Sequence, residues 1–294
     1  MKIGLTAYDV HPTEFVELGR AADAAGFSSL WLGEHVLVPL GYETEHPTTQ
    51  QPGVQHHTGP IVRPDTELVD PLVQFAAVAA VTTGIELATG IFVLPLRHPL
   101  AVARSICTLQ DLSAGRFLLG LGFGWLREEF DALDVPFGER VSRFEEGVEV
   151  LRLACAGGEI RHSGRHFDIA GVQVCNRPTP VPLMLGGNVE RALQRAAVLG
   201  DGWFASGTPP FDEAVRLRTE VLSRRAATDR ADEPFRVTVR ITGVDPEVVD
   251  TYAEAGFDEV LLWADQIWPS NEPLEVQRAT VFEHAAALGL EPRT

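Results

Sequence analysis

The sequence predicts an α/β protein built as a single (β/α)8 barrel over residues 1–294. Short apolar segments alternate along the chain with segments of helical periodicity, and eight such pairs can be counted. Regular alternation of this kind requires a parallel sheet, and eight units close most economically into a barrel, which commonly needs about 250 residues. No linker, low-complexity tract or mid-chain change in composition marks two halves, which favours a barrel over an open doubly wound sheet.

The predicted strands are short apolar runs bounded by glycine, proline or polar residues. In chain order they cover residues 1–8, 27–35, 85–96, 117–124, 182–187, 202–207, 235–241 and 259–264. The fourth run closes on Gly120, Gly122 and Gly124, where a ligand can approach the backbone closely. In α/β barrels the chemistry lies at such carboxyl ends of strands.

The helices are predicted from start and stop signals together with apolar periodicity. Asp70 followed by Pro71 combines an N-cap with proline at the first helical position, and Pro99 begins a helix that Gly115 ends. The predicted helices cover residues 13–25, 70–83, 99–112, 127–133 and 139–156, with further helices beginning near 189, 211, 246 and 273.

Two segments interrupt this alternation. Residues 36–69 form a loop after the second strand that is too long for an ordinary βα connection, so a functional lid or a disordered segment is expected. Residues 159–180 alternate apolar and polar positions around a Ser163-Gly164 turn, which predicts a hairpin-like insertion before the fifth strand.

Composition limits the possible partners and location. Acidic residues outnumber basic ones 41 to 24, and the formal charge of -17 argues against nucleic-acid and anionic-membrane partners. Cys107, Cys155 and Cys175 lack metal-type spacing and are expected to be reduced. With neither a signal peptide nor a membrane-spanning run in the sequence, a cytoplasmic protein is expected.

Glu34 and His35 end the second predicted strand, on the face where barrels carry function. Histidine exchanges protons most readily near neutral pH, so His35 is a candidate for proton transfer, with Glu34 placed to orient or tune it. A structural histidine bonded to a neighbouring loop is the alternative.

Gly186, Gly187 and Asn188 end the fifth strand and open a helix. The free N–H groups at a helix start suit a phosphate, whereas a glycine turn with Asn188 as N-cap explains the same residues. The glycine spacing around Gly122, Phe123 and Gly124 excludes a dinucleotide fingerprint and predicts a floor for a flat ring.

Aromatic and charged residues at the strand ends complete the candidates. Four tryptophans at or just past strand ends suggest a wall for a planar or apolar ligand: Trp125, Trp203, Trp263 and Trp268. His46, His56 and His57 lack further ligands at suitable spacing, so no metal site is expected. Arg240 within the seventh strand needs an anionic partner that the sequence does not identify.

With these residues identified, the chain resembles the luciferase-like monooxygenase superfamily, and most closely its branch that uses coenzyme F-420. The resemblance covers essentially the whole chain, and its motifs are specific in combination. They are AADAAGFSSLWLGEH at 21–35, LATGIFVLPLRHPL at 87–100, SAGRFLLGLGFGW at 113–125, RVSRFEEGVEVLR at 140–152, NRPTPVPLMLGG at 176–187 and Asp-Gly-Trp at 201–203.

The resemblance implies a TIM barrel that holds an isoalloxazine-like ring at its mouth and a small-molecule substrate against that ring. It implies a non-prolyl cis peptide at Gly90–Ile91 facing the ring, and His35 as proton donor or acceptor. Gly186, Gly187 and Asn188 match the loop that holds the cofactor phosphate. A homodimer packed through the early helices is also implied.

One departure bears on the substrate. Relatives that act on sugar phosphates carry a glutamate after the fourth strand, where this chain has Trp125. That substitution puts a proton-relay carboxylate at this place in doubt and favours an apolar or planar substrate. The expected function is a coenzyme F-420-dependent oxidoreductase. The alternatives are a monooxygenase that uses reduced FMN and a cofactor-free ligand-binding or structural barrel.

Overall fold

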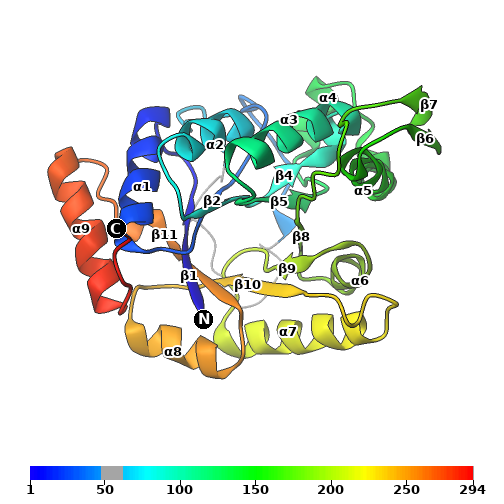
Figure 1. The fold of residues 1–294 in the computed structure, drawn as a ribbon. Helices are drawn as coiled ribbons and strands as arrows, with labels where there is room; N and C mark the ends of the chain where they lie inside the picture. Colours follow the sequence, from blue (N-terminus) through cyan, green and yellow to red (C-terminus); the bar gives the residue numbers. More distant parts are fainter. Residues whose placement is uncertain (48–61, 294) are drawn as a thin grey trace.

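The computed structural model describes residues 1–47 and 62–293, and its strands close into a parallel barrel surrounded by helices (Figure 1). The order around the barrel is β3-β2-β1-β11-β10-β9-β8-β5, and pairing of β3 with β5 completes the ring. The predicted α/β barrel is therefore confirmed.

Eight positions around the barrel are filled by parallel strands, one of them by two short strands in succession. They are β1 (Lys2–Ala7), β2 (Ser29–Leu32), β3 (Glu86–Thr89) with β4 (Phe92–Val93), β5 (Phe117–Gly122), β8 (Leu183–Gly186), β9 (Gly202–Phe204), β10 (Arg236–Arg240) and β11 (Glu259–Trp263).

Helices cover the outside of the strands (Figure 1). They are α1 (Pro12–Ala25), α2 (Pro71–Ala79), α3 (Pro99–Leu112), α4 (Arg127–Ala132), α5 (Arg140–Ala156), α6 (Glu190–Leu199), α7 (Phe211–Ala226), α8 (Pro246–Glu254) and α9 (Leu274–Ala287). The N-cap role predicted for Asp70 is confirmed, because its carboxylate accepts from the Leu72 and Val73 amides.

Helix α2 ends at Ala79 and not near Thr83 as its sequence predicts. The reason lies in α1, where the buried Asp23 carboxylate accepts hydrogen bonds from the backbone amides of Thr83 and Ile85, both at 2.7 Å. These bonds satisfy the amides outside a helix and direct the chain into β3.

The third barrel position departs from the single strand predicted over residues 85–96. Strands β3 and β4 are separated at Gly90–Ile91, whose peptide bond is cis as the resemblance implies, and Leu94–Leu96 form a 3-10 turn. Ala88 pairs with Leu118 and Phe92 with Leu121, so one extra residue is accommodated opposite β5. A bulge of this kind redirects side chains at the rim of a barrel.

The bulge is matched by Gly120 on β5. A Cβ atom at Gly120 would lie 1.8 Å from the Thr89 carbonyl oxygen, and the Thr89 hydroxyl donates to the Gly120 carbonyl at 2.7 Å. Gly120 therefore serves close contact between strands, not the floor of a ligand site.

The core has an inner and an outer part. Inside the barrel, Trp31 and Phe204 stack at a centroid distance of 5.0 Å and pack with the other residues of the inner cluster: Ala88, Leu118, Met184 and Leu261. A larger apolar cluster fills the space between the strands and the helices. The lower part of the barrel is thus filled with side chains, which leaves space for a ligand only at its mouth.

The predicted insertion is an antiparallel hairpin of β6 (Ile160–Ser163) and β7 (Asp168–Val172), which lies beside α5 (Figure 1). Nearby, Cys107 of α3 and Cys155 of α5 bring their sulfur atoms to 3.7 Å as free thiols. Among the described helices, none combines the length and the apolar character needed to cross a bilayer.

Replacing Gly120 with alanine should destabilise the fold by roughly 3 kcal/mol or more, because the new methyl group overlaps the Thr89 carbonyl. Chemical denaturation measures the free energy of unfolding. Gly138→Ala is the matched control, since a Cβ there meets nothing within 4 Å. Equal stability of the two variants would contradict the close approach.

Candidate active site

A cavity of about 420 Å³ opens at the carboxyl ends of the barrel strands. The residues predicted for catalysis and for cofactor binding all line it: Glu34, His35, Gly90, Ile91, Gly122, Phe123, Gly124, Trp125, Gly186, Gly187 and Asn188. These residues come from four of the eight barrel positions, so the topology joins segments up to about half the chain apart. Their chemical roles stay predictions, which the local geometry refines.

His35 is held by a carboxylate that the sequence did not suggest. The His35 Nδ1 lies 2.8 Å from Oε2 of Glu129, a residue of α4 with no exposed surface. The other Glu129 oxygen accepts from the Val36 amide at 2.6 Å and the Leu37 amide at 3.4 Å. An ionised carboxylate only accepts hydrogen bonds, so with Glu129 in its ionised form the neutral His35 ring carries its proton on Nδ1 and leaves Nε2 without one.

Glu34 does not orient His35, which corrects the expected arrangement. Its carboxylate accepts from the Val93 amide at 3.0 Å and forms an ion pair with Arg97. Burial raises the pKa of Glu34 to about 7, and Arg97 and the Val93 amide oppose this shift only in part. Glu34 thus stays in the cavity wall as a carboxyl group that titrates near neutral pH.

Trp125 forms the wall beside His35. Its ring makes edge-on contacts with His35 at 5.6 Å and with two residues of the long loop, Tyr42 at 5.9 Å and His46 at 4.8 Å. The first part of this loop is fixed to α4, where Glu128 accepts from the Glu43 amide and the Thr44 hydroxyl. His56, His57 and the rest of residues 48–61 in the proposed lid lie outside the described residues.

The floor of the cavity is made by Ile91 more than by glycine. A Cβ at Gly122 would lie 2.4 Å from Ile91 Cδ1, and one at Gly186 would lie 3.3 Å from Ile91 Cγ2. The two glycines therefore leave room for the Ile91 side chain, which covers the inner core cluster. An apolar floor of this shape suits one face of a flat ring.

The Gly186–Asn188 turn contradicts one of the two sequence interpretations, the N-cap role of Asn188. Asn188 is not the N-cap of α6, a position taken by Val189, which makes no side-chain capping bond. The Asn188 amide instead bonds to the backbone N–H and carbonyl of Ser206, both at 2.8 Å. The side chain fixes the loop after β9, while the uncapped start of α6 next to Gly187 retains amides suited to an anion.

The tryptophan wall is smaller than predicted. Trp125 and Trp263 line the cavity, whereas Trp203 and Trp268 are buried in the outer core. Trp203 acts indirectly, because its Nε1 donates to the Gly187 carbonyl at 2.7 Å.

Tyr8 is a cavity residue that the sequence analysis missed. Its ring lies 6.4 Å from that of His35, and its hydroxyl is buried with no hydrogen-bond partner among the described residues. Burial raises the pKa of this phenol, so it stays protonated. A buried donor without a partner costs free energy unless a ligand satisfies it. Its only sequence signal is its place at the end of the first predicted strand, residues 1–8.

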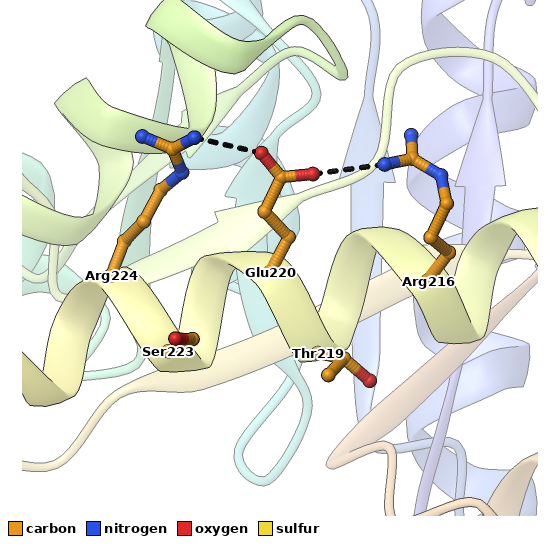
Figure 2. A pocket seen from close by; sticks show the side chains of 5 residues that line it. All are labelled: Arg216, Thr219, Glu220, Ser223 and Arg224. Carbon is orange, nitrogen blue, oxygen red and sulfur yellow. Dashed lines mark hydrogen bonds and ion pairs between the residues drawn. The ribbon is translucent and has the colours of Figure 1, made fainter.

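A second hollow lies on the outer surface of α7 (Figure 2). Glu220 is flanked there by Arg216 at 2.9 Å and Arg224 at 2.8 Å, both one helical turn away. Such pairs are ordinary helix-surface contacts. Across residues 1–47 and 62–293, no group of three His, Cys, Asp or Glu side chains is arranged to hold a metal ion.

Comparison with known proteins gives a family match over most of the chain. The model of the family described as luciferase-like monooxygenase matches residues 2–255. An uncharacterised protein of Mycobacterium tuberculosis is 31% identical, with 82% of this chain and 84% of the relative covered. The F-420-dependent glucose-6-phosphate dehydrogenase of Nakamurella multipartita is 26% identical, with 91% of this chain and 74% of the relative covered.

Solved structures share the fold at lower sequence identity. The monooxygenase RslO1 from Streptomyces bottropensis superimposes with a TM-score of 0.72 and 20% identity over 98% of each chain. An F-420-dependent secondary alcohol dehydrogenase, in complex with an F-420–acetone adduct, gives a TM-score of 0.71 and 16% identity, again over 98% of each chain.

Glu129→Gln should disturb the His35 ring and lower the free energy of unfolding by about 1–3 kcal/mol. The glutamine amide has one oxygen, which cannot serve both the Val36 amide and His35 Nδ1. Nitrogen-15 NMR of the histidine rings measures the change in tautomer. Glu128→Gln is the control, because its carboxylate serves the Glu43–Thr44 segment. An unchanged His35 tautomer in Glu129→Gln would contradict the assignment.

Glu34 should make stability depend on pH. Between pH 4.5 and about 7 the unfolded chain loses this proton while the folded protein retains it. The free energy of unfolding should therefore fall as pH rises through this window, by an amount on the order of 3 kcal/mol. Urea denaturation across the window should show a flatter profile for Glu34→Gln, whereas a change at the exposed Glu67 (Glu67→Gln) should leave the profile as it is.

Proposed function

Because this chain belongs to the luciferase-like monooxygenase family, we propose that it is an oxidoreductase that uses coenzyme F-420 with an apolar or planar small-molecule substrate. The observation that carries the proposal is the His35–Glu129 pair at the wall of an apolar-floored cavity. Similarity to the F-420-dependent dehydrogenase of Nakamurella multipartita over 91% of this chain supports the choice of cofactor.

The cavity residues fit a ring cofactor with an anionic chain. Ile91 offers a flat apolar contact over Gly122. The buried Tyr8 hydroxyl can donate a hydrogen bond to an acceptor on the ring. Gly187 and the uncapped start of α6 would receive the phosphate of the chain. When bound, coenzyme F-420 supplies or accepts a hydride at a ring carbon.

His35 would move the proton that accompanies hydride transfer. Glu129 fixes the imidazole orientation and holds the proton on Nδ1, so Nε2 can accept or deliver one at the cavity. Trp125 replaces the glutamate that relatives acting on sugar phosphates carry after the fourth strand. Glu129, four residues later, would supply a carboxylate in its place, and this carboxylate would act through His35. Trp125 occupies wall space and favours a planar or apolar substrate over a sugar phosphate.

A second candidate function is oxygenation by a monooxygenase that uses reduced FMN. The structural likeness to the monooxygenase RslO1, with a TM-score of 0.72, supports this candidate. Both candidates use the same floor and the same phosphate position. The cofactor-free barrel is the weakest candidate, because an open cavity of about 420 Å³ lies where the ring site is expected.

Titration with the two oxidised cofactors, followed by fluorescence, tests the choice between them. We expect tight, saturable binding of coenzyme F-420 and weaker binding of FMN. Preferential binding of FMN with substrate-dependent oxygen uptake would reject the deazaflavin assignment. Binding of neither cofactor would reject both enzymatic functions.

His35→Asn separates binding from chemistry in the same assay. This variant should bind coenzyme F-420 as the parent does and lose turnover by roughly 10²–10⁴-fold, because the proton-transfer group is gone. A screen of ketones, enones and quinones against the reduced cofactor, read by recovery of the oxidised absorbance, supplies the turnover measurement. Normal turnover in His35→Asn would contradict the role of this residue.

A further inference from the structure

We propose that Arg240 binds a carboxylate of the substrate inside the barrel cavity, so that the substrate class is a small carboxylate on an apolar or planar body. This inference deepens the proposed function, and it rests on that function in treating the bound carboxylate as the substrate. The residues that define the binding site all line the cavity.

Arg240 is the last residue of β10 and lines the cavity. Its guanidinium carbon lies 4.9 Å from the centroid of the Phe204 ring and 5.0 Å from that of Trp263. Its Nε donates to the Gly207 carbonyl at 3.2 Å. Contact with two rings and one carbonyl fixes the plane of the guanidinium, which is the condition for two-point recognition of a carboxylate.

The rings that hold Arg240 are themselves fixed. Phe204 stacks on Trp31 in the inner core at 5.0 Å, and Trp263 donates from Nε1 to the Thr208 hydroxyl at 3.4 Å. The guanidinium therefore sits over the packed core of the barrel, in a position that is set before any ligand arrives. A preorganised charge loses little entropy on binding.

The charge of Arg240 is not balanced by the protein in the described part of the chain. Burial alone lowers the pKa of Arg240, to about 10, and no carboxylate among these residues raises it, although Asp265 lines the same cavity. The group is still a cation at neutral pH. The Arg240 side chain is half-buried in the cavity wall, and a cation withdrawn from bulk water in this way is most stable when an anion accompanies it.

Two other arginines close to the barrel strands have such partners. Arg97 pairs with Glu34, and Arg236 lies 2.6 Å from Glu86 at the opposite end of β10. This chain carries a formal charge of -17 and supplies carboxylates to these two sites. At Arg240 we expect a ligand to supply the carboxylate.

Position favours the substrate over the cofactor as the source of that anion. The predicted phosphate position lies at Gly187 after β8, and β9 separates it from Arg240 on β10. Arg240 is instead bordered by Phe204 and Trp263, which suit an apolar or aromatic body attached to the carboxylate.

The test uses calorimetric titration of the protein without cofactor. The probes are benzoate, 2-naphthoate and octanoate, each paired with its neutral amide. The parent protein should bind at least one carboxylate about tenfold or more tightly than its amide, which corresponds to one charge-assisted contact. Arg240→Met should abolish this preference, and Arg240→Lys should retain part of it. Arg104→Met, which removes a charge from the surface of α3, should leave it unchanged.

Two results would overturn the proposal. The first is a parent protein that binds no carboxylate more tightly than its amide, and the second is a preference that survives in Arg240→Met. A parallel titration with FMN and riboflavin identifies the source of the anion. If Arg240→Met loses the preference for FMN over riboflavin, Arg240 serves the cofactor phosphate and the substrate assignment is wrong. The carboxylate titrations are made without cofactor, so their outcome does not depend on which cofactor binds. Failure of the proposed function would show in the cofactor titration and is therefore distinguishable from failure of the carboxylate site.

Discussion

The interruption of the third barrel position determines the site. One extra residue at Gly90–Ile91 breaks the pairing with β5, and Gly120 allows the Thr89 carbonyl to approach that strand closely. As a result Ile91 projects over Gly122 and Gly186 and separates the packed inner core from the open cavity. The volume for a ligand, its apolar floor and the position of the surrounding polar groups all follow from where this side chain lies.

Much of the fold was predictable because it depends on local patterns. Apolar runs, proline at helix starts and glycine at helix ends place the strands and most helices within a few residues. The predicted end of α2 was wrong because the carboxylate of Asp23, distant in sequence, accepts hydrogen bonds from the amides that follow the helix. The cis peptide at Gly90–Ile91 was implied by the family resemblance, whereas the apolar pattern of residues 85–96 predicted one uninterrupted strand.

Many residues that line the cavity were predictable from the sequence, but the hydrogen bonds and ion pairs between them were not. Position at strand ends correctly placed His35 and Trp125 at the cavity, because parallel strands bring their carboxyl ends together. The carboxylate partner of His35 could not be found in this way, since Glu129 lies on α4 and is 94 residues away in sequence. Nothing in the sequence distinguishes Trp203, whose side chain is fully buried, from Trp263, which is half-buried and lines the cavity.

Helix α4 has a bearing on how the specificity of this barrel can be altered. Two adjacent glutamates on this six-residue helix hold the loop after β2 at two points, Glu129 at Val36 and Glu128 at Thr44. A loop transplanted from a relative would keep these anchors only if its own backbone amides met Glu129 and Glu128 at the same places. Replacement of this loop is therefore expected to succeed best when the two segments, distant in sequence, are transferred as one unit.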